Sequence, residues 1–135
     1  GNSVAADVLL KLPHLTGDER FERFAIAVLR LTVSQIRRYP NGFGRALSAI
    51  AFYLGRVKEI VIIGQKGNKL EKEIFQEFLP NKVVVLSRNL SDERDFIPLL
   101  EQREMIGGEA TAYVCENFAC QLPVNDVEQL RKQLN

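Results

Sequence analysis

Two short runs of mostly β-branched residues constrain the fold of this chain more than any other feature. Residues 59–63 (EIVII) and 82–86 (KVVVL) are apolar after their first residue, which is typical of strands covered on both faces. Residues 70–78 lie between them and carry apolar side chains at helical spacing. A strand, a helix and a strand within about 30 residues predict a βαβ unit with parallel strands.

The residues after this unit predict a third strand and a last helix. Residues 111–115 (TAYVC) follow the turn pair Gly107-Gly108 and predict the strand. Asn125 and Glu128 are a capping pair for the last helix. A weaker helix is expected from Ser91, limited by Pro98. The second half is therefore expected to form a small three-stranded, mostly parallel sheet flanked by helices.

The first half of the chain predicts helices. Apolar residues recur at helical spacing from residue 4 to residue 12, and Pro13 is expected to end that helix. Two longer helices are expected from Thr16 to Pro40 and from Asn41 to Gly55. Joined by a short turn, they make a helical hairpin, which we expect to pack on the sheet.

The expected fold class is therefore α/β, with a helical part at residues 1–57 and a small α/β part at residues 58–135. The chain has 135 residues, which suits one compact domain better than two ordinary ones.

Composition excludes several kinds of protein. The chain has 18 lysine and arginine residues against 17 aspartate and glutamate residues, so it lacks the basic excess of a nucleic-acid binder. No apolar run approaches the roughly 18 residues of a membrane span. One histidine and two cysteines cannot complete a tetrahedral zinc site, and two cysteines are too few for a secreted disulfide framework. We expect a cytoplasmic protein with no nucleic-acid partner, no membrane, no metal and no cofactor.

One candidate binding site is the turn formed by Gly64, Gln65, Lys66 and Gly67. It lies between a predicted strand and a predicted helix, where backbone N–H groups and the helix dipole can receive a phosphate. However, a P-loop requires Gly-Lys-Ser/Thr at its end and a dinucleotide site requires Gly-x-Gly-x-x-Gly, and neither pattern is present. A tight turn in which glycine supplies a positive φ is the favoured interpretation, with an anion or nucleotide site as the alternative.

The second candidate is the pair Cys115 and Cys120, at the end of a predicted strand and in the loop that follows. Dithiol redox centres normally use Cys-x-x-Cys at a helix N-terminus, whereas four residues separate these two cysteines. Two partly buried, inert thiols are the favoured interpretation, and a dithiol redox module is the alternative. No residue is assigned a catalytic role.

Several segments resemble one family of large proteins. Residues 1–6 (GNSVAA), 46–55 (ALSAIAFYLG), 59–64 (EIVIIG) and 111–120 (TAYVCENFAC), followed by Pro123-Val124, resemble the thioredoxin-domain-containing, spermatogenesis-associated thioredoxin-like family. The resemblance implies an N-terminal thioredoxin-like domain, then an (α/α) toroid similar to N-acylglucosamine 2-epimerases and six-hairpin glycosidases, and this stretch last. It also implies that the helical part is the end of the toroid, and the missing initiator Met agrees with a fragment.

The resemblance transfers no catalytic residue, because neither the thioredoxin-type Cys-x-x-Cys nor most of the toroid lies in this chain. We therefore expect a C-terminal structural or assembly module that is non-catalytic in isolation. The full-length family protein is compatible with an enzyme acting on a carbohydrate or a thiol. The expected partners are the remainder of its own full-length chain and a second copy, through an apolar stripe on the helices from Thr16 to Leu54.

Overall fold

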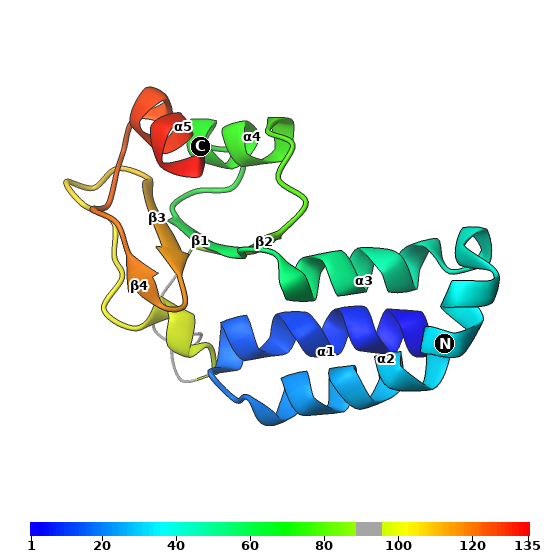
Figure 1. Cartoon of the computed structure of the whole chain (residues 1–135). Helices are drawn as coiled ribbons and strands as arrows, with labels where there is room; N and C mark the ends of the chain where they lie inside the picture. Colours follow the sequence, from blue (N-terminus) through cyan, green and yellow to red (C-terminus); the bar gives the residue numbers. More distant parts are fainter. Residues whose placement is uncertain (89–95) are drawn as a thin grey trace. The chain divides into compact units, whose positions relative to one another are not determined.

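The computed structural model describes residues 1–88 and 96–135. The chain divides into two compact units, Gly1–Arg56 and Val57–Asn135 (Figure 1). The first unit is helical and the second is mixed α/β. The helix predicted from Ser91 falls largely on residues 91–95, which lie outside the described residues.

Three α-helices and a short 3₁₀ turn make up the helical unit: α1 (Asn2–Thr16), α2 (Arg20–Arg38), η1 (Pro40–Gly42) and α3 (Gly44–Leu54). The prediction that Pro13 ends the first helix is wrong, because α1 continues to Thr16. The helix ends instead at Gly17, whose φ of 73° and N–H bond to the Pro13 carbonyl form a left-handed cap.

Small residues line the core of this unit. Helix α1 packs against both α2 and α3. The buried side chains at these contacts include several alanines, which let helix backbones approach closely. They are Ala6, Leu10, Ala25, Leu29, Ile36, Ala46, Ala49 and Phe52.

The second unit is built on a four-stranded sheet. Its elements in chain order are β1 (Lys58–Ile63), α4 (Lys69–Gln76), β2 (Lys82–Ser87), η2 (Pro98–Leu100), β3 (Thr111–Glu116), β4 (Ala119–Cys120) and α5 (Val127–Leu134). The strand order is β2-β1-β3-β4. The N-cap of α4 is Asn68 and that of α5 is Asp126, each accepting two backbone N–H bonds.

The expectation of a three-stranded, mostly parallel sheet is wrong. Strands β1 and β2 are parallel, as the βαβ pattern predicts, but β3 is antiparallel to β1 and β4 is antiparallel to β3. A parallel third strand needs a long crossover, usually a helix. The described part of the connection from β2 to β3 contains only η2.

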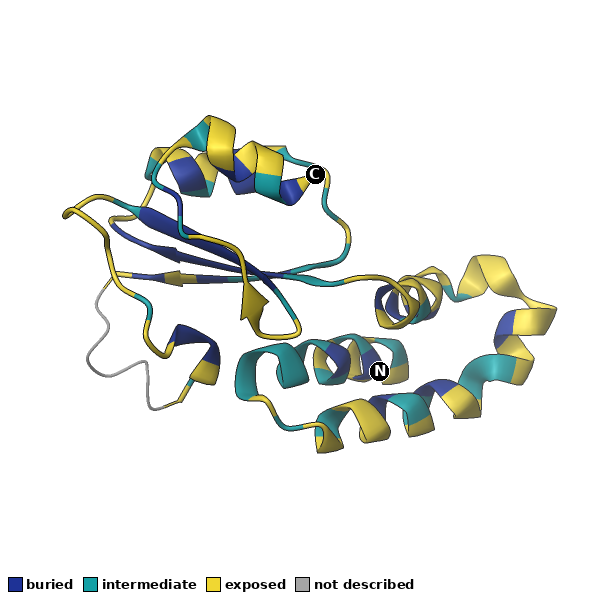
Figure 2. Ribbon diagram, turned by 60° about the vertical axis from the view of Figure 1, so that its left-hand side comes forward, coloured by how far each residue is buried: buried dark blue, intermediate teal, exposed yellow. Residues whose placement is uncertain are grey.

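Helices α4 and α5 cover one face of the sheet. The core there contains Ile60 and Ile62 from β1, Ala112 and Val114 from β3, Leu70 and Ile74 from α4, and Leu130 and Leu134 from α5. Figure 2 shows these elements buried toward one another and the outer sides of both helices exposed. Residues of β1 that point to the other face are buried too. By contrast, β2 is an edge strand, and its Leu86 is exposed, so the predicted burial on both faces holds for β1 alone.

Candidate functional site

Cys115 and Cys120 form a disulfide that joins β3 to β4. They are direct partners in the antiparallel register, because the two-residue turn Asn117-Phe118 brings residue 120 opposite residue 115. This corrects the favoured interpretation of two separate thiols. The spacing contained the signal, since two cysteines with four residues between them fall opposite each other around a two-residue hairpin turn.

The hairpin turn has an unusual backbone. Asn117 and Phe118 have φ angles of 49° and 64°, the pattern of a type I′ turn, in which glycine or asparagine is preferred. The Phe118 N–H donates a hydrogen bond of 2.8 Å to the Glu59 carboxylate. Glu59 is fully buried on β1 and lies opposite Cys115 in the register, so it holds the turn from the neighbouring strand.

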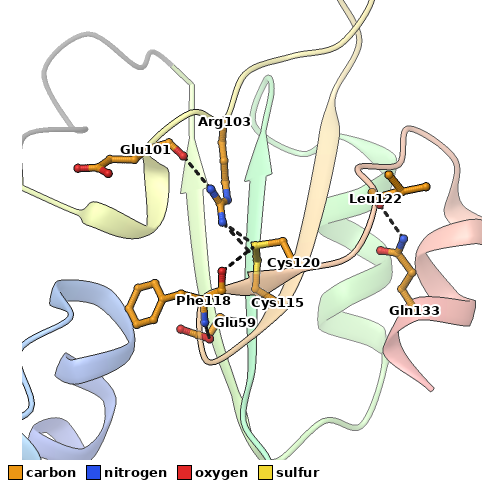
Figure 3. Close-up of a disulfide and its surroundings, with 8 residues drawn as sticks. All are labelled: Glu59, Glu101, Arg103, Cys115, Phe118, Cys120, Leu122 and Gln133. Carbon is orange, nitrogen blue, oxygen red and sulfur yellow. Dashed lines mark hydrogen bonds between the residues drawn. A yellow bond between two sulfur atoms is a disulfide. The ribbon is translucent and has the colours of Figure 1, made fainter.

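Arg103 points its guanidinium at the disulfide (Figure 3). Its Nη2 lies 2.6 Å from the Cys120 Sγ and 3.5 Å from the Cys115 Sγ. Its Nη1 donates to the Glu101 carbonyl at 2.7 Å. The guanidinium also lies over the Tyr113 ring, 5.5 Å from the centroid, a cation–π contact. Three contacts therefore fix a positive charge beside the two sulfurs.

Sequence reasoning missed Glu59 and Arg103. Glu59 carried a usable signal, because it is the single acidic residue of an otherwise apolar run. Arg103 carried none, since the residues around it form no helix or strand and follow no periodic pattern.

The loop at Gly64 to Gly67 satisfies part of its own hydrogen bonding. The Gly67 N–H donates to the Glu71 carboxylate at 2.7 Å, and the Asn68 side chain accepts from the N–H groups of Leu70 and Glu71. Gly67 has the positive φ that a tight turn requires, 75°. These internal acceptors compete with an external anion for the same N–H groups.

A cavity of about 180 Å³ nevertheless opens beside this loop. It lies past the carboxyl ends of the parallel strands β1 and β2, the edge at which α/β sheets bind ligands. Its lining includes the cationic side chains of Lys66 and Arg88 and the carboxylate of Glu71. Gln65 is exposed and is not among its lining residues.

A larger hollow of about 650 Å³ lies at the end of α2, lined by Arg37, Arg38 and Tyr39 among others. Positive charge there complements the C-terminus of the helix. Within residues 1–88 and 96–135, no group of three His, Cys, Asp or Glu side chains is placed to hold a metal ion. None of the helices described is long and apolar enough to cross a membrane.

The fold and the site define a small mixed α/β unit with a hairpin disulfide, together with a three-helix unit. No protein-family model matches the chain, and no solved structure does either.

Curated proteins do match it. The chain is 33% identical to human spermatogenesis-associated protein 20, 32% identical to the rat protein and 30% identical to the mouse protein. Each match covers 99% of this chain and 18% of the relative. The chain is thus homologous to the C-terminal part of this family and spans less than a fifth of its relatives' length. The predicted relationship to a larger spermatogenesis-associated protein is confirmed, and the toroid stays a prediction.

Proposed function

We propose that this chain is a structural module of a larger protein, without a catalytic role in isolation, and that its helical unit packs against further helices of that protein. The observation that carries the proposal is an apolar stripe on the outer side of α2. The thioredoxin-like and toroid domains, and the chemistry on carbohydrates or thiols that the resemblance implies, would belong to other parts of such a protein.

The α2 stripe consists of Phe24, Ala27 and Leu31, which share one helical face because they are three and four residues apart. Phe24 is 60% exposed and Leu31 is 74% exposed, and Ala27 is exposed between them. The buried face of α2 is a different one, with Ala25, Leu29 and Ile36. A surface helix that packs on one side only keeps its outer face polar, so these three exposed apolar residues are the part of α2 that a second neighbour would cover.

The relatives are much longer than this chain. Their length supports the proposal that helices of the same polypeptide pack on the α2 stripe. The match covers 18% of human spermatogenesis-associated protein 20, so most of such a chain lies outside it. In the isolated chain the stripe is open, and a second copy is the available substitute.

Light scattering on the isolated chain tests this proposal. We expect the average mass to rise with concentration, and the double variant F24S/L31S to weaken self-association by more than about tenfold, because two large apolar side chains leave the contact. The matched control is F78S, since Phe78 is 89% exposed in the other unit. A wild-type monomer at every concentration, or an equal effect of F78S, would contradict the proposal.

Binding of a small anion or nucleotide is a second candidate function, favoured by the cavity beside Lys66 and Arg88. Phosphate and ATP are then expected to raise the melting temperature of the wild type, and the double variant K66Q/R88Q to lose that increase. An unchanged melting temperature in the presence of both compounds would exclude this candidate.

A further inference from the structure

We propose that the Cys115–Cys120 disulfide is a reversible thiol–disulfide exchange site that reacts with dithiols, and that Arg103 stabilises the thiolate released when the bond opens. This activity goes beyond the structural role proposed above and does not depend on it.

The two sulfurs differ in accessibility. Cys115 is 1% exposed on β3, whereas Cys120 is an exposed residue on the short outer strand β4. Exchange begins when a thiolate attacks one sulfur of a disulfide, and access decides which sulfur is attacked. Attack from solvent therefore falls on Cys120 and makes Cys115 the leaving group.

The position of Arg103 fits that reaction. A closed disulfide is neutral and gains little from a cation, but the leaving thiolate carries a full negative charge. The Arg103 Nη2 is 3.5 Å from the Cys115 Sγ and 2.6 Å from the Cys120 Sγ, so it can stabilise the thiolate that forms on either sulfur as the exchange proceeds. The guanidinium is already fixed by the Glu101 carbonyl and the Tyr113 ring. A donor held in advance where charge develops is an effective way to stabilise it.

Two acidic side chains near Cys115 make contacts of their own. The Glu59 carboxylate, on the strand next to Cys115, accepts from the Phe118 N–H. Glu116 lies beside Cys115 in the chain, and its carboxylate is 3.6 Å from the Lys58 ammonium. Among the described residues, Arg103 is the charged side chain that is hydrogen-bonded to both sulfurs.

The reaction balances with a dithiol as the reductant. One thiolate of the dithiol bonds to the Cys120 Sγ as the bond between the two cysteine sulfurs breaks, and Cys115 leaves as a thiolate. The second thiolate of the dithiol then attacks the dithiol sulfur that is bonded to Cys120 in the mixed disulfide. Cys120 leaves as a thiolate. Two electrons pass from the dithiol, which becomes a disulfide, and its two protons end on Cys115 and Cys120.

The hairpin is held by other bonds when the disulfide opens. The Gln121 N–H donates to the Val114 carbonyl at 2.9 Å, and Glu59 holds the turn through Phe118. The two thiols therefore stay opposite each other, which lets the bond form again.

Reduction of the folded chain by dithiothreitol, quenched by alkylation and followed by mass spectrometry, tests the proposal. We expect R103Q to be reduced about tenfold more slowly than the wild type, because it loses a charge-assisted bond to the leaving thiolate. R103K is expected to keep part of the rate. K72Q, which removes an exposed positive charge from α4, is expected to react like the wild type. Equal rates for R103Q and the wild type, or reduction only in denaturant, would overturn the proposal.

Single-cysteine variants give a second measurement that does not depend on Arg103. C115S leaves Cys120 as a thiol, and we expect it to be alkylated at least about tenfold faster in the folded chain than Cys115 in C120S, since thiol reactivity follows access and thiolate character. Equal alkylation rates, or faster labelling of C120S, would also overturn the proposal.

Discussion

Close approach, rather than anion binding, accounts for glycine at position 64. A Cβ at Gly64 would lie 2.7 Å from the Cβ of Ala110 and 3.0 Å from its Cα. Gly64 thus lets the loop after β1 pass directly beside the residue that precedes β3.

We therefore expect Gly64→Ala to destabilise the fold by about 1–3 kcal/mol, the usual cost of overpacking. Adding Ala110→Gly should recover part of that loss. The matched control is Gly44→Ala, where an added Cβ meets nothing within 4 Å. Chemical denaturation measures the free energy of unfolding of the two single variants and of the double variant. Equal stabilities of Gly64→Ala and Gly44→Ala would refute the close approach of Gly64 to Ala110 as the reason for glycine at position 64.

A single side chain also caps α5. The sequence predicts Asn125 as the cap, but the structure uses Asp126, whose carboxylate accepts from the N–H groups of Glu128 and Gln129. Asn125 instead donates its amide to the Ile106 carbonyl. Both residue types cap helices well, so the sequence alone does not separate two adjacent candidates.

Asp126→Ala should cost about 1 kcal/mol of stability, measured by urea unfolding. Asp126→Asn should retain most of it, because an amide oxygen can accept the same bonds. A loss as large in Asp126→Asn as in Asp126→Ala would show that the stabilisation does not come from capping.

At the scale of elements, an ion pair between Arg131 of α5 and Glu73 of α4 joins the two helices. The Arg131 Nε lies 2.7 Å from the Glu73 carboxylate. That hydrogen bond, with the positive charge of Arg131, holds the pKa of Glu73 below its ordinary value near 4.5. A lowered folded-state pKa adds stability that is present above the ordinary pKa and is lost as the pH falls through the folded-state pKa.

The free energy of unfolding should therefore drop more steeply in the wild type than in Arg131→Gln between about pH 6 and about pH 3. Denaturant titrations at a series of pH values measure the difference. Parallel profiles would mean that the pair makes no net contribution to stability.

The sequence predicts the elements better than it predicts their pairing. The two β-branched runs predict β1 and β2, helical spacing predicts α4, and the short crossover makes the first two strands parallel. Strand direction at β3 could not be predicted, because a buried strand has the same composition in either direction. The two-residue strand β4 is too short for any pattern. The pairing of Cys120 with Cys115 was missed although their spacing fits a two-residue hairpin turn.

At the scale of the whole molecule, the sequence indicates a module and leaves its chemistry open. The two cysteines could be named from the sequence. Arg103 reaches the disulfide, and Glu59 reaches the hairpin turn beside it, only through contacts between residues far apart in the chain. The helical half could be assigned to a larger assembly, whereas the exposed side of α2 had to be seen in the structure, since Phe24 fits the buried stripe by spacing alone.

The most direct measurement of the module proposal is hydroxyl-radical footprinting of Phe24 and Leu31. Two samples are compared: the isolated chain, and human spermatogenesis-associated protein 20 carrying this chain in place of its matching segment. Both side chains should be labelled in the isolated chain at low concentration and protected in the longer protein, while Phe78 changes little. Equal labelling of Phe24 and Leu31 in both samples would contradict the proposal that α2 packs against the rest of the protein.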